Sequence, residues 1–179
     1  MSLDTALKNT GYAIFGVNKD FSFQFFGCGE YETNTHDDRS TRIRATLNFL
    51  DKMIQEFKIN VIITEEPPAV FDKFKSLGVV KLSAACGAVI GYCQAKGIYV
   101  REMGPSTWQA GFPKRPKGKK VAGETKVISV HQANAILKYL GSSRHLLMSE
   151  HHAADAMNIG VFTIKQWHSG KWKAPYESV

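Results

Sequence analysis

Four side chains of this sequence have the chemistry to bind a divalent cation together: Asp4, Glu65, His152 and Asp155. His152 and Asp155 are three residues apart in the segment 149–160, whose small and apolar residues predict a helix with Ser149 as its N-cap. In such a helix both side chains lie on one face, so an imidazole and a carboxylate can share one cation. Taken alone, such a pair is more often a capping and dipole arrangement near a helix N-terminus.

Asp4 and Glu65 each follow a short apolar segment. The segment 60–64, Asn-Val-Ile-Ile-Thr, predicts a strand that is buried on both faces and ends on Glu65. Ligands bind at the carboxyl ends of strands in α/β sheets, where carboxylates suit Mg²⁺ or Mn²⁺. Two such ions about 3.5–4 Å apart can activate a water and stabilise the leaving oxygen in phosphodiester hydrolysis. Considered singly, Asp4 could be a turn residue and Glu65 a solvated strand end.

The net charge of +7 is concentrated in one part of the chain. Residues 1–100 carry eleven basic and eleven acidic residues, whereas residues 101–147 carry nine basic and two acidic ones. Most of the excess belongs to five cations: Lys114, Arg115, Lys117, Lys119 and Lys120. A solvated loop is one interpretation. Because Pro and Gly interrupt these cations, we expect a flexible arm that follows a phosphate backbone and binds nucleic acid.

Length and composition indicate one globular domain over residues 1–179, with 44% hydrophobic and 22% charged residues. No apolar run approaches the roughly 18–20 residues of a membrane span, and no signal peptide precedes the first motif, so we expect no membrane association. The three cysteines, Cys28, Cys86 and Cys93, lack metal-ligand spacing and are expected in the core of a protein from a reducing compartment.

Hydrophobic patterns predict alternating strands and helices. Segments rich in β-branched and aromatic residues are expected as strands: 10–17, 21–26, 60–64 and 97–103. Segments with helical spacing are expected as helices: 38–57, 76–95, 125–140 and 149–166. With a first strand ending at Asp4, this order predicts an α/β fold whose mixed sheet carries helices on both faces.

Three short motifs, in this order, resemble those of the RuvC family of Holliday junction resolvases. Residues 4–13, Asp-Thr-Ala-Leu-Lys-Asn-Thr-Gly-Tyr-Ala, resemble the motif in which an Asp ends the first strand and Thr-Gly-Tyr opens the second. Residues 63–66, Ile-Thr-Glu-Glu, resemble the strand that ends on the second catalytic acid. Residues 152–156, His-Ala-Ala-Asp-Ala, resemble the final motif. Order and spacing agree along roughly the whole chain.

The resemblance implies a ribonuclease-H-like fold with a five-stranded mixed sheet, a homodimer, and cleavage of four-way DNA junctions by paired symmetric nicks. Asp4, Glu65, His152 and Asp155 would hold two Mg²⁺ or Mn²⁺ ions, with no organic cofactor. Lys126 falls near a basic residue that such resolvases place close to the scissile phosphate. Because a metal-binding imidazole must be neutral, activity is expected to fall below about pH 6.5.

The sequence departs from the family pattern in three places. Only three residues precede Asp4, where the family has a longer apolar strand. Pro68 stands at the position of the family's aromatic wedge, so Phe71 or Phe74 is expected to replace it in DNA binding. The basic loop before Lys126 is also longer and more highly charged than the resemblance leads us to expect.

Several alternatives remain open from the sequence. The same fold could serve a flap, branched-DNA or RNA–DNA hybrid nuclease, an inert nucleic-acid-binding module or, less favoured, an integrase-like enzyme. The Ala- and Gly-rich helix 76–95 is a candidate dimer interface, and packing against its own sheet explains its composition equally well. The expected location is the bacterial cytoplasm, and the compact size suits a bacteriophage that debranches its replicated DNA.

Overall fold

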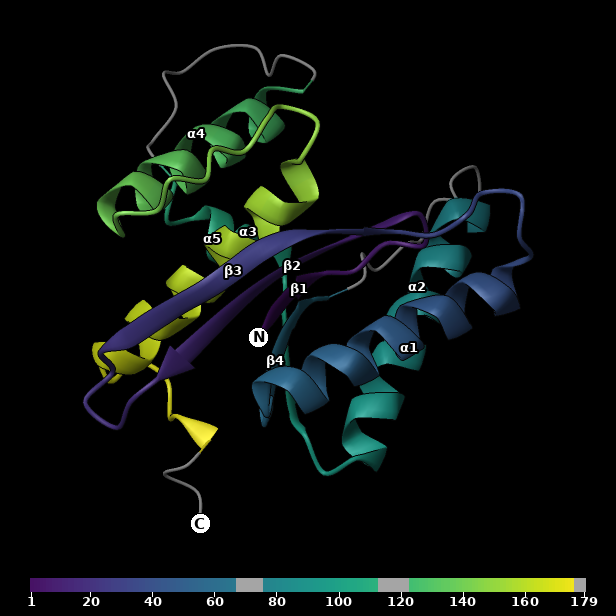
Figure 1. Cartoon of the computed structure of the whole chain (residues 1–179), viewed down its shortest axis with the longest axis horizontal. Coiled ribbons are helices and arrows are strands. Elements are labelled where there is room, and N and C mark those ends of the chain that lie inside the picture. The colour runs from purple at the N-terminus through teal and green to yellow at the C-terminus, as the bar shows by residue number, and fades with distance from the viewer. Residues whose placement is uncertain (67–75, 113–122, 176–179) are drawn as a thin grey trace.

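A five-stranded mixed sheet lies at the centre of the computed structural model, which describes residues 1–66, 76–112 and 123–175. The strand order is β3-β2-β1-β4-β5. The strands are β1 (Ser2–Asp4), β2 (Asn9–Val17), β3 (Phe23–Glu32), β4 (Val61–Glu65) and β5 (Tyr99–Met103). Strand β2 pairs antiparallel with β1 and β3, whereas β4 pairs parallel with β1 and β5. The predicted mixed sheet is therefore confirmed (Figure 1).

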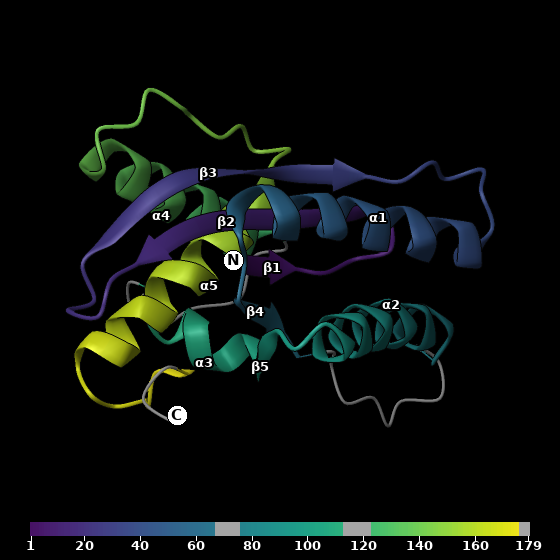
Figure 2. The ribbon, with the colours of Figure 1, turned by 60° about the horizontal axis from the view of Figure 1, so that its bottom comes forward.

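Helices cover both faces of this sheet, as predicted. Two of them, α1 (Arg39–Phe57) and α2 (Ser76–Ala95), lie together on one face (Figure 2). Helix α5 (His151–His168) crosses the other face, and α4 (Glu124–Tyr139) packs on α5. The short helix α3 (Pro105–Gln109) follows β5. The four longer helices, α1, α2, α4 and α5, begin and end within about two residues of the predicted bounds.

Strand β3 differs from its prediction because it continues to Glu32 instead of ending near Phe26. The backbone hydrogen bonds with β2 continue as far as the pair Asn9 and Glu32. Pairing with β2 therefore extends β3 through Gly27 and Gly29, which have little strand preference of their own. Phe21, expected in this strand, instead lies in the hairpin turn with a positive φ of 64°.

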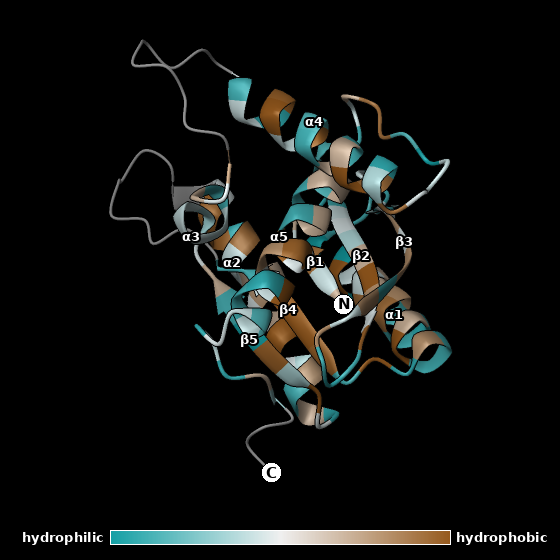
Figure 3. Cartoon of the chain, turned by 90° about the vertical axis from the view of Figure 1, so that its left-hand side faces the viewer, coloured by the Kyte–Doolittle hydropathy of each residue, from teal (hydrophilic) through white to brown (hydrophobic). Residues whose placement is uncertain are grey.

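The central strands are apolar on both faces, as predicted for the segment that ends on Glu65. Leu3 of β1 and Ile62 of β4 are fully buried, and β4 is brown in the hydropathy view (Figure 3). The cysteines Cys28, Cys86 and Cys93 are buried and free, which confirms them as core residues.

Helix α2 is more apolar than the sequence suggested. Its segment Gly78–Ala95 has a mean hydropathy of 1.2 and is long enough to cross a membrane by length and composition alone, which corrects the expectation of no such run. Only 22% of this segment is buried. One side, including Val89 and Cys93, packs into the core, while Ser83, Gly87 and Gly91 stay exposed. Packing on its own sheet thus accounts for one side of α2, and among the described residues none covers Ser83, Gly87 and Gly91 on the other side.

The contact between α5 and β2 requires glycine at position 11. A Cβ on Gly11 would lie 1.9 Å from the carbonyl oxygen of His152, and one on Gly160 would lie 2.4 Å from the Phe15 ring. The Ser2 hydroxyl adds a hydrogen bond of 2.7 Å to the carbonyl oxygen of Ala156. The first turns of α5 therefore lie directly on β2 because no side chain separates them.

We expect Gly11→Ala to lower the free energy of unfolding by at least about 2 kcal/mol, because the added methyl group overlaps the α5 backbone. The measurement is urea denaturation followed by circular dichroism. Gly27→Ala is the matched control on β3, since a Cβ at that position meets no atom within 4 Å. Equal stability of the two variants would show that α5 does not depend on this close approach.

Candidate active site

The fold brings together the four side chains predicted to bind metal. Asp4 ends β1 and Glu65 ends β4, and these strands are parallel neighbours with Leu3 opposite Thr64, so both acids lie at one edge of the sheet. His152 and Asp155 lie on the first turns of α5. Nδ1 of His152 is 2.6 Å from Oδ2 of Asp4 and donates to it, which joins α5 to the end of β1.

Glu65 carries a raised pKa of about 7. Burial is the main cause, and the neighbouring charge of Asp4 adds to it, whereas a hydrogen bond from Trp108 opposes it. The indole Nε1 of Trp108 donates to Oε1 of Glu65 over 2.9 Å. Trp108 is itself buried on α3, so it fixes the orientation of this carboxylate.

Asp155 also has a pKa raised to about 7, chiefly by burial, with a further contribution from the charge of Asp4. The Ser129 hydroxyl of α4 donates a short hydrogen bond to Oδ1 of Asp155. Nδ2 of Asn158 in turn donates to the Ser129 hydroxyl over 2.9 Å and to its carbonyl oxygen over 3.0 Å. The buried contact between α4 and α5 therefore orients the second carboxylate.

The hydrogen bond to Asp4 raises the pKa of His152, and partial burial of the ring opposes this rise. His151, the preceding residue, lies beside it with the ring centroids 4.2 Å apart, and burial lowers the pKa of His151. Nδ1 of His151 faces the carbonyl oxygen of Ser149 at 3.3 Å. Of these two histidines, His152 is the one that makes a hydrogen bond to a predicted acid, Asp4.

A carboxylate from β3 caps the N-terminus of α5. Oε1 of Glu30 accepts hydrogen bonds from the backbone N–H groups of His152 at 3.0 Å and Ala153 at 3.3 Å. Asn9 holds the other oxygen, Oε2, at 3.2 Å. The predicted N-cap Ser149 is wrong: the capping position is Glu150, without a side-chain capping bond, because Glu30 already supplies the acceptor.

Lys126 is exposed on the first turn of α4, and its charge lowers the pKa values of Asp155 and His151. This proximity agrees with the predicted place of Lys126 beside the acids, and its catalytic role stays a prediction. The residues predicted to bind DNA lie outside the described residues: Phe71, Phe74, Lys114, Arg115, Lys117, Lys119 and Lys120.

Across the described ranges, no group of three or more His, Cys, Asp or Glu side chains is close enough to hold a metal ion as the side chains stand. Each predicted ligand instead has a protein partner: Asp4 and His152 bond each other, Glu65 bonds Trp108 and Asp155 bonds Ser129. The four groups nevertheless act on one another electrostatically, since the charges of Asp4, His152 and Asp155 all shift the pKa of Glu65.

Comparisons with known proteins found sequence similarity to RuvC proteins over 60% of the chain. The crossover junction endodeoxyribonuclease RuvC of Rickettsia akari (strain Hartford) is 27% identical over 107 residues, which are 60% of this chain and 66% of that protein. RuvC of Rickettsia bellii (strain OSU 85-389) is 26% identical with the same coverage. The chain thus aligns with just under two thirds of the length of these relatives. No family model matches it.

Solved structures show the same likeness. RuvC of T. thermophilus, in complex with a Holliday junction substrate, has a TM-score of 0.68 at 15% identity and covers 94% of both chains. The Fowlpox virus resolvase, in complex with its substrate Holliday junction DNA, has a TM-score of 0.54 at 14% identity, covering 92% of this chain and 95% of that chain. The resemblance to the RuvC family is confirmed. The RuvC-like chain therefore has the ribonuclease-H-like fold expected from its three motifs.

Three residues that position the predicted ligands were not predicted: Glu30, Trp108 and Ser129. Each acts on a partner at least 26 residues away along the chain, and the contact between Glu30 and His152 spans 122 residues. A Trp after a strand or a Ser inside a helix has no local pattern that would mark it as a partner of a carboxylate. The sequence did offer Gly11 as a signal of the close approach of α5, because a glycine inside a strand often marks a place where another backbone lies near.

We expect Glu30→Ala to destabilise the protein by about 1–2 kcal/mol, because two N–H groups of α5 lose their acceptor. It should also lower the pKa of His152, since the charge of Glu30 contributes to raising it. The measurements are urea denaturation and an NMR titration of the imidazole. Glu32→Ala is the control, as the exposed Glu32 contacts only Lys8 among the ion pairs of the described chain. An unchanged His152 titration would contradict this role of Glu30.

Asp155→Asn is expected to stabilise the chelator-treated protein increasingly as the pH rises from about 4 to 7.5. The folded pKa of Asp155, about 7, exceeds its ordinary value of 3.8, so the folded chain binds more protons in this range and the ionised carboxylate destabilises it. The gain should be near zero at pH 4 and about 1–3 kcal/mol at pH 7.5.

The comparison with wild type isolates this effect, because the buried Met1 amino group, with a pKa lowered to about 5, acts in the opposite sense in both proteins. Urea denaturation across the pH range measures it. Glu56→Gln, at an exposed position of α1, is measured alongside as the control. If the difference in the free energy of unfolding between Asp155→Asn and wild type did not change with pH, the pKa of Asp155 would not be raised in the folded protein.

Proposed function

We propose that this chain is a RuvC-type nuclease, a single domain that hydrolyses phosphodiester bonds at four-way DNA junctions with divalent metal ions. The observation that carries the proposal is the meeting of Asp4, Glu65, His152 and Asp155 at one edge of a RuvC-like fold. Sequence similarity to RuvC supports the reaction type. The known relatives found in complex with Holliday junctions support the substrate.

The donor set fits a hard divalent cation. Three carboxylates and one imidazole lie in a partly buried site, where burial first and the charge of Asp4 second raise the pKa values of Glu65 and Asp155 to about 7. Mg²⁺ or Mn²⁺ suits such oxygen-rich ligands. Bound there, two divalent ions would supply Lewis-acid stabilisation of the charge that develops on the phosphate.

The surrounding residues prepare these donors for binding. Trp108 engages Oε1 of Glu65, and Ser129 engages Oδ1 of Asp155, so the second oxygen of each carboxylate is the natural cation ligand. The bond from Nδ1–H of His152 to Asp4 fixes the neutral tautomer whose lone pair is on Nε2. Lys126, whose charge acts on Asp155, would neutralise a phosphate that enters beside this carboxylate.

A broader nuclease of the same fold, acting on flaps or RNA–DNA hybrids, and an inert binding module are the competing functions. The gathering of all four metal-binding side chains favours an active enzyme over an inert module. Cleavage rates on four-way junctions, three-way junctions and hybrids, compared side by side, distinguish a junction-specific nuclease from a broader nuclease of the same fold. Location in the bacterial cytoplasm and a bacteriophage origin stay predictions.

Asp155→Asn should lower cleavage of a synthetic four-way junction in Mg²⁺ or Mn²⁺ by at least about a hundredfold and leave junction binding within about threefold of wild type. Removing one negative ligand weakens cation binding, whereas affinity for DNA comes from cations elsewhere. Mapped nicks on a labelled junction and gel-shift titrations give the two quantities. Asp37→Asn, in an exposed turn, is the control. Full cleavage by Asp155→Asn would remove Asp155 from the active site.

We further propose that two copies of the chain associate through the uncovered side of α2, which would present two sites to opposed strands. Four small residues recur every four positions on this side and are exposed: Ser83, Gly87, Gly91 and Ala95. A Cβ on either glycine meets no atom within 4 Å, so this side leaves room for the backbone of a second helix to approach closely. A resolvase that makes paired symmetric nicks requires such a symmetric pair.

The double variant Gly87→Leu/Gly91→Leu should convert a dimer into a monomer, because the new side chains hold the helices apart, and their Cβ atoms meet no atom within 4 Å in the described chain. Sedimentation velocity across a concentration series measures the change. Lys165→Leu adds a similar apolar group to an exposed position of α5 and should leave the dimer intact. A wild-type monomer at all concentrations, or a dimeric double variant, would refute this interface.

A further inference from the structure

We infer that Leu147 and Met148 form an apolar wedge that enters the branch point of the junction and stacks against its opened bases. The inference rests on the proposed function. Both side chains are large and solvent-exposed, at 63% and 49%. They precede His152 by five and four residues, so their Cα atoms lie within about 18 Å of that residue. The wedge therefore stands beside the catalytic helix.

The loop that carries these two side chains is fixed by its own hydrogen bonds. Leu146, the preceding residue, is buried, and the side chain of Asn134 binds both its N–H at 2.8 Å and its carbonyl oxygen at 2.9 Å. Oε2 of Glu150 accepts from the N–H of Leu147 at 2.9 Å, and its Oε1 pairs with Arg144 at 2.7 Å. A loop braced at both ends holds its apolar tip in place before DNA arrives, which lowers the entropy lost on binding.

The position of the loop points to nucleic acid as its partner. In Figure 1 the connection between α4 and α5 returns from the C-terminal end of α4 along that helix to the start of α5. Lys126, on the first turn of α4, acts electrostatically on His151, which follows Met148 by three residues. A lysine can bind a backbone phosphate while neighbouring apolar side chains contact the base next to it. Leu and Met are among the side chains that proteins insert between base steps.

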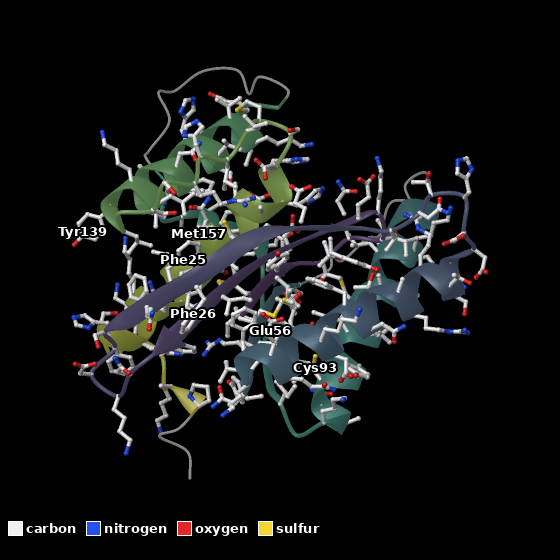
Figure 4. All side chains as sticks on the ribbon, viewed as in Figure 1. Phe25, Phe26, Glu56, Cys93, Tyr139 and Met157 are labelled. Carbon is white, nitrogen blue, oxygen red and sulfur yellow. The ribbon has the colours of Figure 1, made fainter. Side chains whose placement is uncertain are left out.

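The test compares wild type, Leu147→Ser/Met148→Ser, Phe71→Ser/Phe74→Ser and the control Tyr139→Ser. Tyr139 is 88% exposed and lies at the far end of α4 (Figure 4), so it matches the wedge in exposure but not in place. Each protein is mixed with a fully paired four-way junction carrying 2-aminopurine at the branch point, and with a junction whose branch-point bases are unpaired. Base opening is read as 2-aminopurine fluorescence in Ca²⁺, and cleavage is read in Mg²⁺.

We expect the wedge variant to lose the fluorescence rise and to cleave the paired junction at least about tenfold more slowly, with cleavage recovering on the unpaired junction. The Tyr139 control should match wild type. A wedge variant with wild-type fluorescence, or one equally slow on both junctions, overturns the inference while leaving the proposed function in place. Loss of the fluorescence rise only in the Phe71/Phe74 variant also overturns it. If wild type cuts neither junction, the proposed function fails and the inference fails with it.

Discussion

The arrangement of this molecule depends on the direct contact between the backbone of α5 and strand β2 at Gly11. Any side chain at that position would occupy the space of the His152 carbonyl group. Because the helix backbone can approach so closely, Glu30 of the neighbouring strand reaches the first free N–H groups of α5, and His152 reaches Asp4. One steric condition in the sheet therefore sets the depth, direction and capping of the helix that carries half of the predicted ligands.

The same arrangement concentrates negative charge where the fold can least stabilise it. Burial raises the pKa values of Glu65 and Asp155 to about 7, and Asp4 adds to both shifts. Hydrogen bonds from Trp108 and Ser129 relieve this only in part. A site that opposes its own ionisation in this way lowers folding stability, which is a common property of functional sites and agrees with the proposed binding of a cation.

Much of this could be predicted from the sequence. The mixed sheet and the helices on both faces follow from hydrophobic periodicity and local residue types, which act over a few neighbouring positions, and the three motifs were found by their resemblance to the RuvC family. The capping of α5 by Glu30, the extension of β3 to Glu32 and the partners of the two carboxylates could not be predicted. Those features depend on contacts between segments that are distant in the sequence. Ser149 was predicted as the N-cap of α5 because the sequence does not show that Glu30 of β3 accepts the free N–H groups of this helix.

The most direct test of the central claim, that this charged edge is a divalent cation site, is anomalous diffraction from crystals of the full chain grown or soaked in Mn²⁺. The account predicts anomalous peaks between the side chains of Asp4, Glu65, His152 and Asp155, at coordination distance from the carboxylate oxygens that Trp108 and Ser129 do not engage. Full occupancy of Mn²⁺ elsewhere in the crystal, with no peak at these four side chains, would contradict it.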